Sequence, residues 1–248
     1  MHYSDGIARY YDFFGTAWGR IDDAARFLID LVPERSSILE IGAGIGVTAA
    51  ALAAAGHKVT ALEPDLEMYT VLMARLALRA DLEPNLTPIP KAAGYPLHSR
   101  FDLCTCFSVL HLLDAPQQAA LVSYAHQMTA PGGRVVLEIP VASPERRLRP
   151  LEMAAHRQFG EVRYEHHVAM EELPDGSWHT HWKFRATHLD LPVDEISQTF
   201  HWRPLSMTDS DRLLRDGRIG IEAEYAGFDR SPFLRGESRI RLVVGRAI

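Results

Sequence analysis

The chain has 248 residues and a formal net charge of −6, with 26 Lys and Arg against 32 Asp and Glu. Its 47% hydrophobic and 23% charged residues are typical of a folded globular protein and exclude a disordered chain. The acidic balance disfavours duplex nucleic acid and a membrane surface as partners, because both attract basic protein faces. The length predicts one domain, or one domain that carries an insertion.

No targeting or membrane-spanning segment is recognisable. Residues Met1–Asp5 lack the basic and apolar regions of a signal peptide, and the longest apolar stretch, Val47–Gly56, is too short to cross a bilayer. We expect the two cysteines, Cys104 and Cys106, to be free thiols, which suit a reducing cytoplasm. The sequence therefore predicts a soluble cytoplasmic protein.

Predicted helices and strands alternate through the first 140 residues. The expected helices cover residues 7–32 with a break at 15–19, then 47–55, 65–80 and 115–128. The expected strands cover residues 36–41, 58–62, 86–89, 102–108 and 134–140. Asp65 is an expected N-cap, and Gly56 an expected C-cap. This alternation predicts an α/β fold with a parallel, doubly wound sheet covered on both faces.

The pattern changes after residue 140. Residues 162–170, 178–189 and 195–203 alternate with a period of two, which predicts a three-stranded antiparallel sheet with one aromatic face and one polar face. A short helix near 209–215 and two strands near 219–226 and 238–246 are expected to follow. We therefore expect a core formed by residues 1–140 and 209–248, with an antiparallel insertion at 141–208.

A glycine-rich turn and two acidic residues point to a ligand site. The turn Gly42–Gly46 joins an expected strand to an expected helix, where backbone can approach a ligand closely and helix N–H groups are unpaired. A dinucleotide-binding fold is the rival interpretation, although it requires the spacing G-x-G-x-x-G. Glu40 and Glu63 end the first two strands, and such strand ends face the ligand crevice of parallel sheets. Glu63 is placed to accept both hydrogens of a ribose diol.

Four segments occur in an order that is more specific than any one of them. They are Glu40–Gly46, Glu63–Pro64, Phe101–Leu113 and Ala130–Glu138. In these segments the chain resembles the class I S-adenosylmethionine-dependent methyltransferases, and is similar to their small-molecule N-methyltransferase members. The resemblance implies a Rossmann-like seven-stranded sheet with a terminal antiparallel hairpin, S-adenosyl-L-methionine as cofactor and a small-molecule acceptor.

The resemblance also implies roles for individual residues in cofactor binding. The glycine turn would line the methionine portion, Glu63 would bind the ribose, and the next residues, Pro64 and Met68, would pack against the adenine. Residues from the fourth strand would close the site, and Glu40 is implied as a further cofactor-binding residue. The residues implied are Glu40, Gly42, Ala43, Gly44, Glu63, Pro64, Met68, Phe107 and Ser108. Many relatives carry an Asp before the adenine loop, whereas this chain has Lys91, which cannot accept a hydrogen bond. We therefore assign adenine recognition to backbone around Ala92 and Ala93.

Two N-terminal residues complete the expected cofactor site. Tyr11, followed by Asp12, looks similar to the Tyr-Asp segment that covers the sulfonium in small-molecule N-methyltransferases, so Tyr11 is an expected catalytic residue. Tyr10 and Tyr11 are equally compatible with an ordinary amphipathic helix. Arg20 is a candidate partner for the cofactor carboxylate.

His111, just after the fourth strand, is the expected general base. An unperturbed histidine titrates near pH 6.5, which suits proton removal at neutral pH; the alternative is a histidine that only packs. The expected acceptor contacts are His111 and four residues of the insertion, namely Tyr164, His166, Trp182 and Phe184. A small core or a dimer interface would explain the same aromatic face, and a homodimer is left open. His179 and His181 share a face, but no further ligand completes a set, so no metal site is expected.

The predicted function is transfer of a methyl group to a nucleophilic N or O atom of a small molecule. The alternatives are C-methylation, or a methyltransferase-fold protein that uses bound S-adenosylmethionine for other chemistry. A nucleic-acid methyltransferase is disfavoured by the net charge. A binding protein without turnover is disfavoured by the intact Glu40, Glu63 and glycines.

Overall fold

The computed structural model describes residues 6–15, 20–142 and 148–248 and divides the chain into two compact units. The core unit consists of Arg20–Pro144 and Pro204–Ile248, and the antiparallel unit of Met1–Gly19 and Glu145–Arg203. The sequence places residues 1–19 with the core, whereas the described part of that segment, residues 6–15, is grouped with the antiparallel unit. Within the described residues, no helix combines the length and apolar character needed to cross a membrane.

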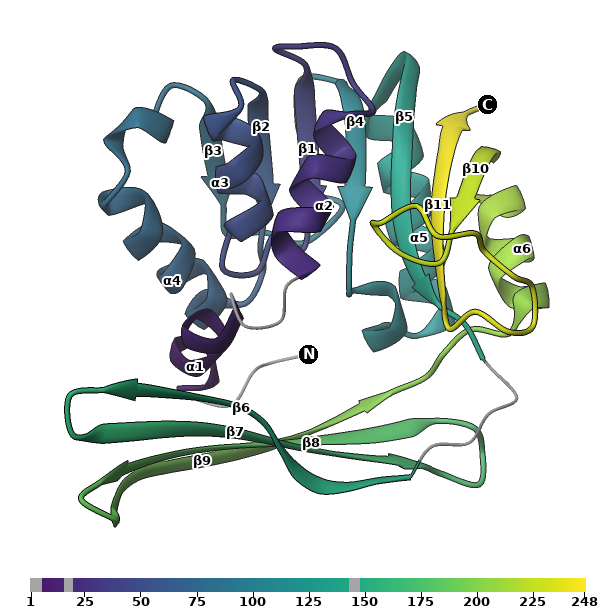
Figure 1. The fold of residues 1–248 in the computed structure, drawn as a ribbon. Coiled ribbons are helices and arrows are strands. Elements are labelled where there is room, and N and C mark those ends of the chain that lie inside the picture. The colour runs from purple at the N-terminus through teal and green to yellow at the C-terminus, as the bar shows by residue number, and fades with distance from the viewer. Residues whose placement is uncertain (1–5, 16–19, 143–147) are drawn as a thin grey trace. The chain divides into compact units, whose positions relative to one another are not determined.

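The core unit contains a seven-stranded sheet (Figure 1). Its strands are β1 (Ser37–Ile41), β2 (Lys58–Leu62), β3 (Leu86–Ile89), β4 (Phe101–Cys106), β5 (Thr129–Pro140), β10 (Ile219–Tyr225) and β11 (Ile240–Ala247). The order is β10-β11-β5-β4-β1-β2-β3, with β1 to β5 parallel and β11 antiparallel to both β5 and β10. This topology confirms the predicted Rossmann-like sheet with a terminal antiparallel hairpin.

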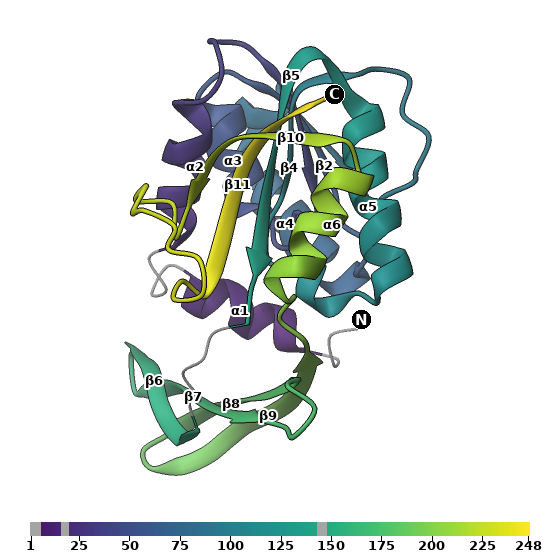
Figure 2. The ribbon, with the colours of Figure 1, turned by 90° about the vertical axis from the view of Figure 1, so that its right-hand side faces the viewer.

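Helices cover both faces of this sheet (Figure 2). The helices are α2 (Arg20–Ile29), α3 (Val47–Ala54), α4 (Leu66–Ala77), α5 (Ala115–Met128) and α6 (Met207–Asp216), with 3-10 turns η2 (Ala80–Leu82) and η3 (Leu110–Leu112). One apolar core lies under α2, α3 and α4, and the other under α5 and α6. Because both faces are covered, the central strands are apolar runs rather than alternating ones.

The predicted N-cap of α4 is confirmed. The Asp65 carboxylate accepts the N–H groups of Glu67 and Met68 at 3.0 and 3.1 Å. At the start of α5, Asp114 and Gln117 form a reciprocal capping box. Each cap fixes the point where a loop at the carboxyl edge of the sheet enters its helix, and these loops carry the candidate site.

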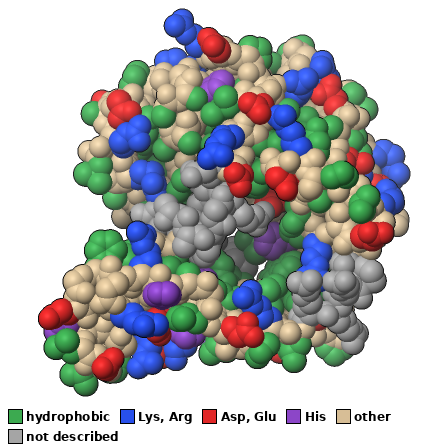
Figure 3. Space-filling view, viewed as in Figure 1, with side chains coloured by type: hydrophobic (Ala, Val, Ile, Leu, Met, Phe, Trp, Pro, Cys, Tyr) green, Lys and Arg blue, Asp and Glu red, His purple; other side chains and the backbone are tan. Residues whose placement is uncertain are grey.

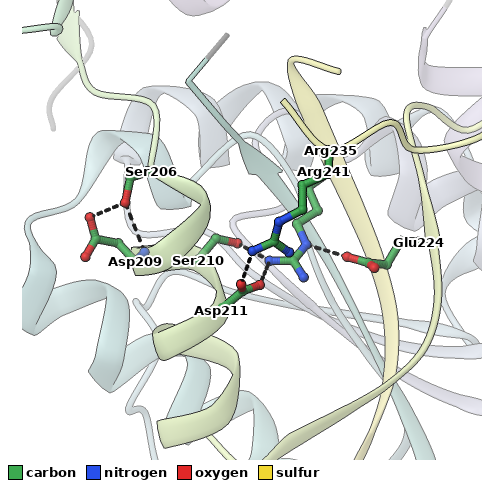
Figure 4. Close-up of polar contacts among 7 residues, drawn as sticks. All are labelled: Ser206, Asp209, Ser210, Asp211, Glu224, Arg235 and Arg241. Atoms are coloured by element: carbon green, nitrogen blue, oxygen red, sulfur yellow. Dashed lines mark hydrogen bonds and ion pairs between the residues drawn. The ribbon is translucent and has the colours of Figure 1, made fainter. Parts of the chain in front are cut away.

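A buried arginine joins α6 to the last hairpin. The Arg241 side chain on β11 is only 1% exposed and donates to Ser210 at 2.8 Å, to Asp211 at 2.7 Å and to Glu224 at 2.5 Å (Figure 4). Arg235 pairs with the same Asp211. Since a buried guanidinium without partners would be costly, these acids make its burial tolerable and tie three elements together.

The antiparallel unit has four strands, so the predicted number of three is wrong. The strands, in spatial order, are β6 (Arg149–Phe159), β7 (Val162–Glu172), β8 (Trp178–His188) and β9 (Leu191–Trp202). β6 has no clean alternation because its pairing with β7 shifts register twice, and it is rich in helix-forming residues. For these two reasons, β6 could not be recognised as a strand from the sequence pattern.

Helix α1 (Ile7–Gly15) packs on this antiparallel sheet within the same unit. The Tyr10 ring stacks on Phe184 with centroids 5.1 Å apart, and its hydroxyl donates to Asp194 at 2.5 Å. Burial, and then the hydrogen bond to Asp194, raise the Tyr10 pKa well above its usual range. These contacts, the second of which joins residues 184 positions apart, explain why α1 belongs to this unit.

Candidate active site

The glycine turn between β1 and α3 has a backbone that only glycine adopts easily. Gly42, Gly44 and Gly46 have φ values of 76°, 56° and 75°, in the left-handed region. The amides of Gly42 and Ala43 donate to the carbonyl of Leu62 on β2 at 2.8 and 2.9 Å, which ties the turn to the neighbouring strand. A Cβ at Gly44 would meet no atom within 4 Å, so the turn leaves room there for a ligand against the backbone.

Glu63 lies directly beside this turn. Its two carboxylate oxygens accept the N–H of Gly44 at 2.7 Å and the N–H of Asp65 at 2.8 Å. The side chain is 6% exposed, and burial raises its pKa while the two amides oppose that rise. Each of these oxygens accepts one backbone N–H and has the lone pairs to accept another hydrogen bond, so the carboxylate retains capacity for a diol on a ligand. The position and chemistry of Glu63 fit the ribose of S-adenosylmethionine.

Glu40 is a second buried carboxyl group at this edge of the sheet. It is 5% exposed, and burial, followed by the charge of Glu63, raises its pKa to about 8, against the effect of the Ala49 backbone amide. Among the described residues, its Oε2 has no hydrogen-bond partner. A buried acceptor of this kind fits a ligand that brings a hydrogen-bond donor or a positive charge.

The raised pKa of Glu40 makes a prediction about stability. Between about pH 4.5 and pH 8, the folded protein keeps a proton that the unfolded chain releases, so this group lowers the free energy of unfolding as the pH rises through that window. Glu40→Gln removes this titration. We expect the cofactor-free variant to match the wild type near pH 5 and to be more stable by at least about 1.4 kcal/mol above pH 8, the equivalent of one pKa unit.

Urea unfolding at pH 5, 7 and 9 measures this difference. Glu237→Gln, at an exposed position, is the matched control and should show no difference that grows with pH. A Glu40→Gln variant whose stability relative to the wild type is the same at all three pH values would contradict the buried, proton-holding state of Glu40.

The tip of β4 brings three predicted residues to the same edge. Phe107 is half-buried and lies against Phe228 of the β10–β11 loop, with ring centroids 4.9 Å apart. Ser108 is exposed and has a φ of 54°. His111 follows in η3 and is half-buried. Since β4 pairs with β1, these side chains belong to the same crevice edge as the glycine turn.

The residues expected around adenine differ in their accessibility. Pro64 and Ala92 are exposed, Ala93 is half-buried, and Met68 is buried. The Glu63 amide donates to the carbonyl of Ile89 at 3.1 Å, so the loop after β3 that carries both alanines begins beside Glu63. The buried Met68 offers a ligand no surface in this structure. The side chain of Arg20 lies outside the part of the chain whose side chains the structure describes.

The four residues of the insertion that were expected to contact the methyl acceptor belong to one aromatic cluster of the antiparallel unit. Tyr11 lies beside Trp182 with ring centroids 5.7 Å apart, and Tyr164 is half-buried. His166 is buried and stacks on Phe184 at 4.4 Å, and burial lowers its pKa to about 4, helped by the nearby His167. His166 is therefore neutral near pH 7.

The prediction that Phe184 contacts the methyl acceptor is wrong. Its ring is 0% exposed because Tyr10 and His166 stack on it and Phe14 packs beside it. It therefore belongs to the hydrophobic core of the antiparallel unit and has no surface for an acceptor. The period-two pattern identified the correct face of β8 but did not reveal that α1 covers this position.

Sequence reasoning assigned no role to three residues near the site. Val109 is the neighbour that a Cβ at Gly42 would strike, at 2.4 Å from its Cγ2. Phe228 contacts Phe107, and the Glu138 carboxylate hydrogen-bonds Ser108. Only Glu138 had a sequence signal, as a single acid within the apolar end of β5. In the described parts of the chain, no group of three His, Cys, Asp or Glu side chains is arranged to hold a metal ion.

Comparison with known proteins identifies the family. A family model described as a methyltransferase domain matches residues 16–192, which is more than half of the chain. No curated protein sequence matches significantly.

Several solved structures share the fold. DesVI of Streptomyces venezuelae is similar with a TM-score of 0.78 and 20% identity, over 99% of this chain and 100% of that chain. KedS8, a sugar N-methyltransferase of a Streptoalloteichus species, has a TM-score of 0.72 and 17% identity, over 95% and 91%. S-adenosylmethionine-bound CalS10, an amino pentose methyltransferase of Micromonospora echinaspora, has a TM-score of 0.69 and 19% identity, over 91% and 89%. With the glycine turn and the strand-end acids, the matched family model shows that the chain belongs to the methyltransferase domain family and is a class I enzyme whose cofactor is S-adenosylmethionine.

Proposed function

We propose that this methyltransferase acts on a nucleophilic N or O atom of a small molecule. The observation that carries the proposal is the position of His111, a half-buried titratable side chain in η3, at the carboxyl edge of the sheet where β1 and β2 present Glu40 and Glu63. An amine or hydroxyl acceptor brings a proton that must leave, and a histidine at this edge is suited to take it.

The cofactor supplies a methyl group on a positively charged sulfur. In the proposal, Gly42, Ala43 and Gly44 bind its methionine portion, with Glu40 beneath them. Glu63 accepts hydrogen bonds from the two ribose hydroxyl groups. Pro64 and the backbone of Ala92 and Ala93 contact the adenine. Phe107 and Ser108 close the site at β4, Tyr11 covers the sulfonium, and Arg20 binds the cofactor carboxylate. Holding the reacting atoms in line away from water accounts for much of the rate in such displacements.

The proposed acceptor is an amine on a small polar molecule, with amino sugars as the first class to test. The similar KedS8 is a sugar N-methyltransferase and CalS10 is an amino pentose methyltransferase, which supports this choice. Tyr164 and Trp182, both half-buried, are the proposed acceptor contacts of the antiparallel unit. His166 is 2% exposed and, like Phe184, offers an acceptor no surface, so it is not kept as a contact.

Neither nucleic acid nor a membrane is a proposed partner. The net charge of −6 repels polyanions, and on the described part of the core face drawn in Figure 3 acidic and basic side chains are interspersed. We place the protein in the cytoplasm because both cysteines are free thiols, buried in β4. A homodimer would give the apolar side chains at the exposed β6 edge, Leu151 and Met153, a partner.

A panel of acceptors tests the proposal. The protein is incubated with S-adenosylmethionine carrying a labelled methyl group and with matched amino and hydroxy sugars, and label in the product is located by mass spectrometry. We expect transfer to an N or O atom. Label found on carbon, or cofactor consumed without any transfer of methyl, would contradict the proposal.

A further inference from the structure

A buried carboxylate lies where the chain leaves the tip of β4. Glu138 on β5 is 2% exposed, and its Oε2 accepts both the backbone N–H and the Oγ hydrogen of Ser108, each at 2.9 Å. β4 ends at Cys106, whose register partner on β5 is Leu137. Glu138 is therefore the first residue of β5 beyond the end of β4, and its side chain bonds the chain that follows β4.

The two hydrogen bonds hold an unfavourable backbone conformation. Ser108 has a φ of 54°, a left-handed value that residues with a Cβ rarely adopt. Both of its donors bond one oxygen of Glu138, so a change in φ at Ser108 would break two hydrogen bonds to a buried carboxyl group. Such strain persists only when the surrounding structure compensates for it, and it concentrates at functional sites.

The bend at Ser108 determines the positions of Val109 and η3. Val109 is the next residue, and it lies so close to the glycine turn that a Cβ added to Gly42 would be 2.4 Å from its Cγ2. η3 then begins and carries His111. One turn therefore sets both the packing of β4 against the cofactor-binding glycines and the place of the proposed base.

η3 is anchored independently of Ser108. The Gln118 amide on α5 donates to the carbonyls of Leu110 and Leu113, on either side of η3, at 2.9 and 3.0 Å. Glu138 thus holds the residue before Val109, whereas Gln118 holds η3 itself. This asymmetry provides a test that separates the two anchors.

We propose that Glu138 is a positioning residue for methyl transfer. It acts through Ser108. By holding that residue in the left-handed conformation, it keeps Val109 against Gly42 and keeps η3 in place at the carboxyl edge of the sheet. The link to catalysis through His111 rests on the proposed function, whereas the link to cofactor binding through Val109 does not.

The test uses binding and spectroscopy, which do not require turnover. In Glu138→Gln, the oxygen that accepts both Ser108 donors becomes an amide oxygen, which is a weaker hydrogen-bond acceptor than a carboxylate oxygen, so Ser108 is held less well. We expect the Kd for S-adenosylhomocysteine, measured by calorimetry, to rise about threefold to tenfold, and the NMR resonance of the His111 imidazole to shift. Gln118→Ala, which releases η3 but leaves the hydrogen bonds between Glu138 and Ser108 intact, is the matched control and should move the His111 resonance with less than a twofold change in that Kd.

Glycine at position 108 provides a rescue. Ser108→Gly adopts the left-handed φ without strain, so Glu138→Gln should weaken binding less than twofold in that background. If Glu138→Gln fails to fold, the serine variants alone carry the test. Ser108→Ala keeps the strain and loses the hydroxyl donor, so it should bind S-adenosylhomocysteine less tightly than Ser108→Gly.

Three results would overturn the proposal: an unchanged Kd and His111 resonance in Glu138→Gln, an equal loss in the Ser108→Gly background, or Ser108→Ala binding as tightly as Ser108→Gly. If His111→Ala keeps full turnover while the Glu138 variants change the Kd as described, the base assignment fails and the positioning role of Glu138 stands.

Discussion

Glu63→Gln is expected to weaken S-adenosylmethionine binding by about tenfold to a hundredfold. In the structure, both carboxylate oxygens accept backbone N–H groups, from Gly44 and Asp65. An amide would turn a donor toward one of these N–H groups and would also lose an acceptor for the ribose diol. Leaving buried hydrogen-bonding groups unsatisfied costs about 1–3 kcal/mol, which corresponds to this loss of affinity.

Isothermal titration calorimetry measures this loss directly. Glu83→Gln provides the control, because Glu83 is exposed and follows η2 in the same unit. The control should bind S-adenosylmethionine like the wild type. Equal affinity in Glu63→Gln and the control would remove Glu63 from the cofactor site.

His111→Ala should have the largest effect on turnover. Loss of a general base lowers kcat by about 10²- to 10⁴-fold. Because the base acts only when neutral, we expect wild-type kcat to rise with pH along an acidic limb that the variant lacks. S-adenosylhomocysteine should bind to the variant within threefold of the wild type, since the glycine turn and Glu63 are intact.

Steady-state kinetics between pH 5 and pH 9, with an acceptor found in the panel, measure both features. His98→Ala is the matched control, because His98 is exposed in the loop between β3 and β4. A His111 variant with full kcat at pH 7 would show that the acceptor needs no base from this residue.

The parts of the site that the sequence predicted depend on local pattern. A glycine-rich turn after a buried strand and acids at the ends of neighbouring parallel strands are adjacent by topology alone, so the order of motifs along the chain is enough to bring Glu40, Gly44 and Glu63 together. The structure confirms that Gly44 and Glu63 are neighbours through the hydrogen bond between them, and the charge of Glu63 acts on Glu40.

The parts that the sequence missed depend on contacts between distant segments. Tyr10 and Asp194 are 184 positions apart and form a hydrogen bond, which joins α1 to the antiparallel unit. Glu138 lies on β5 and Ser108 follows β4, 30 positions earlier in the chain, so neither residue alone indicates the hydrogen bonds between them. Helical and strand periodicity describe one element at a time and carry no information on such pairs.

The sequence pattern also could not show which side chains of a strand are buried by another element. Alternation along β8 correctly separated its apolar and polar faces, but Phe184 and Trp182 share a face and differ in accessibility. α1 covers the first and leaves the second half-buried. A period-two pattern cannot rank residues on one face, because the covering helix comes from a remote part of the chain.

A crystal structure with bound S-adenosylhomocysteine tests the central claim most directly. The account predicts the nucleoside at the carboxyl edge of β1 and β2, with its ribose hydroxyls on the Glu63 carboxylate and its amino-acid portion along Gly42–Gly44. The same ligand bound at another surface, or absent from this edge at saturating concentration, would contradict the assignment of the site.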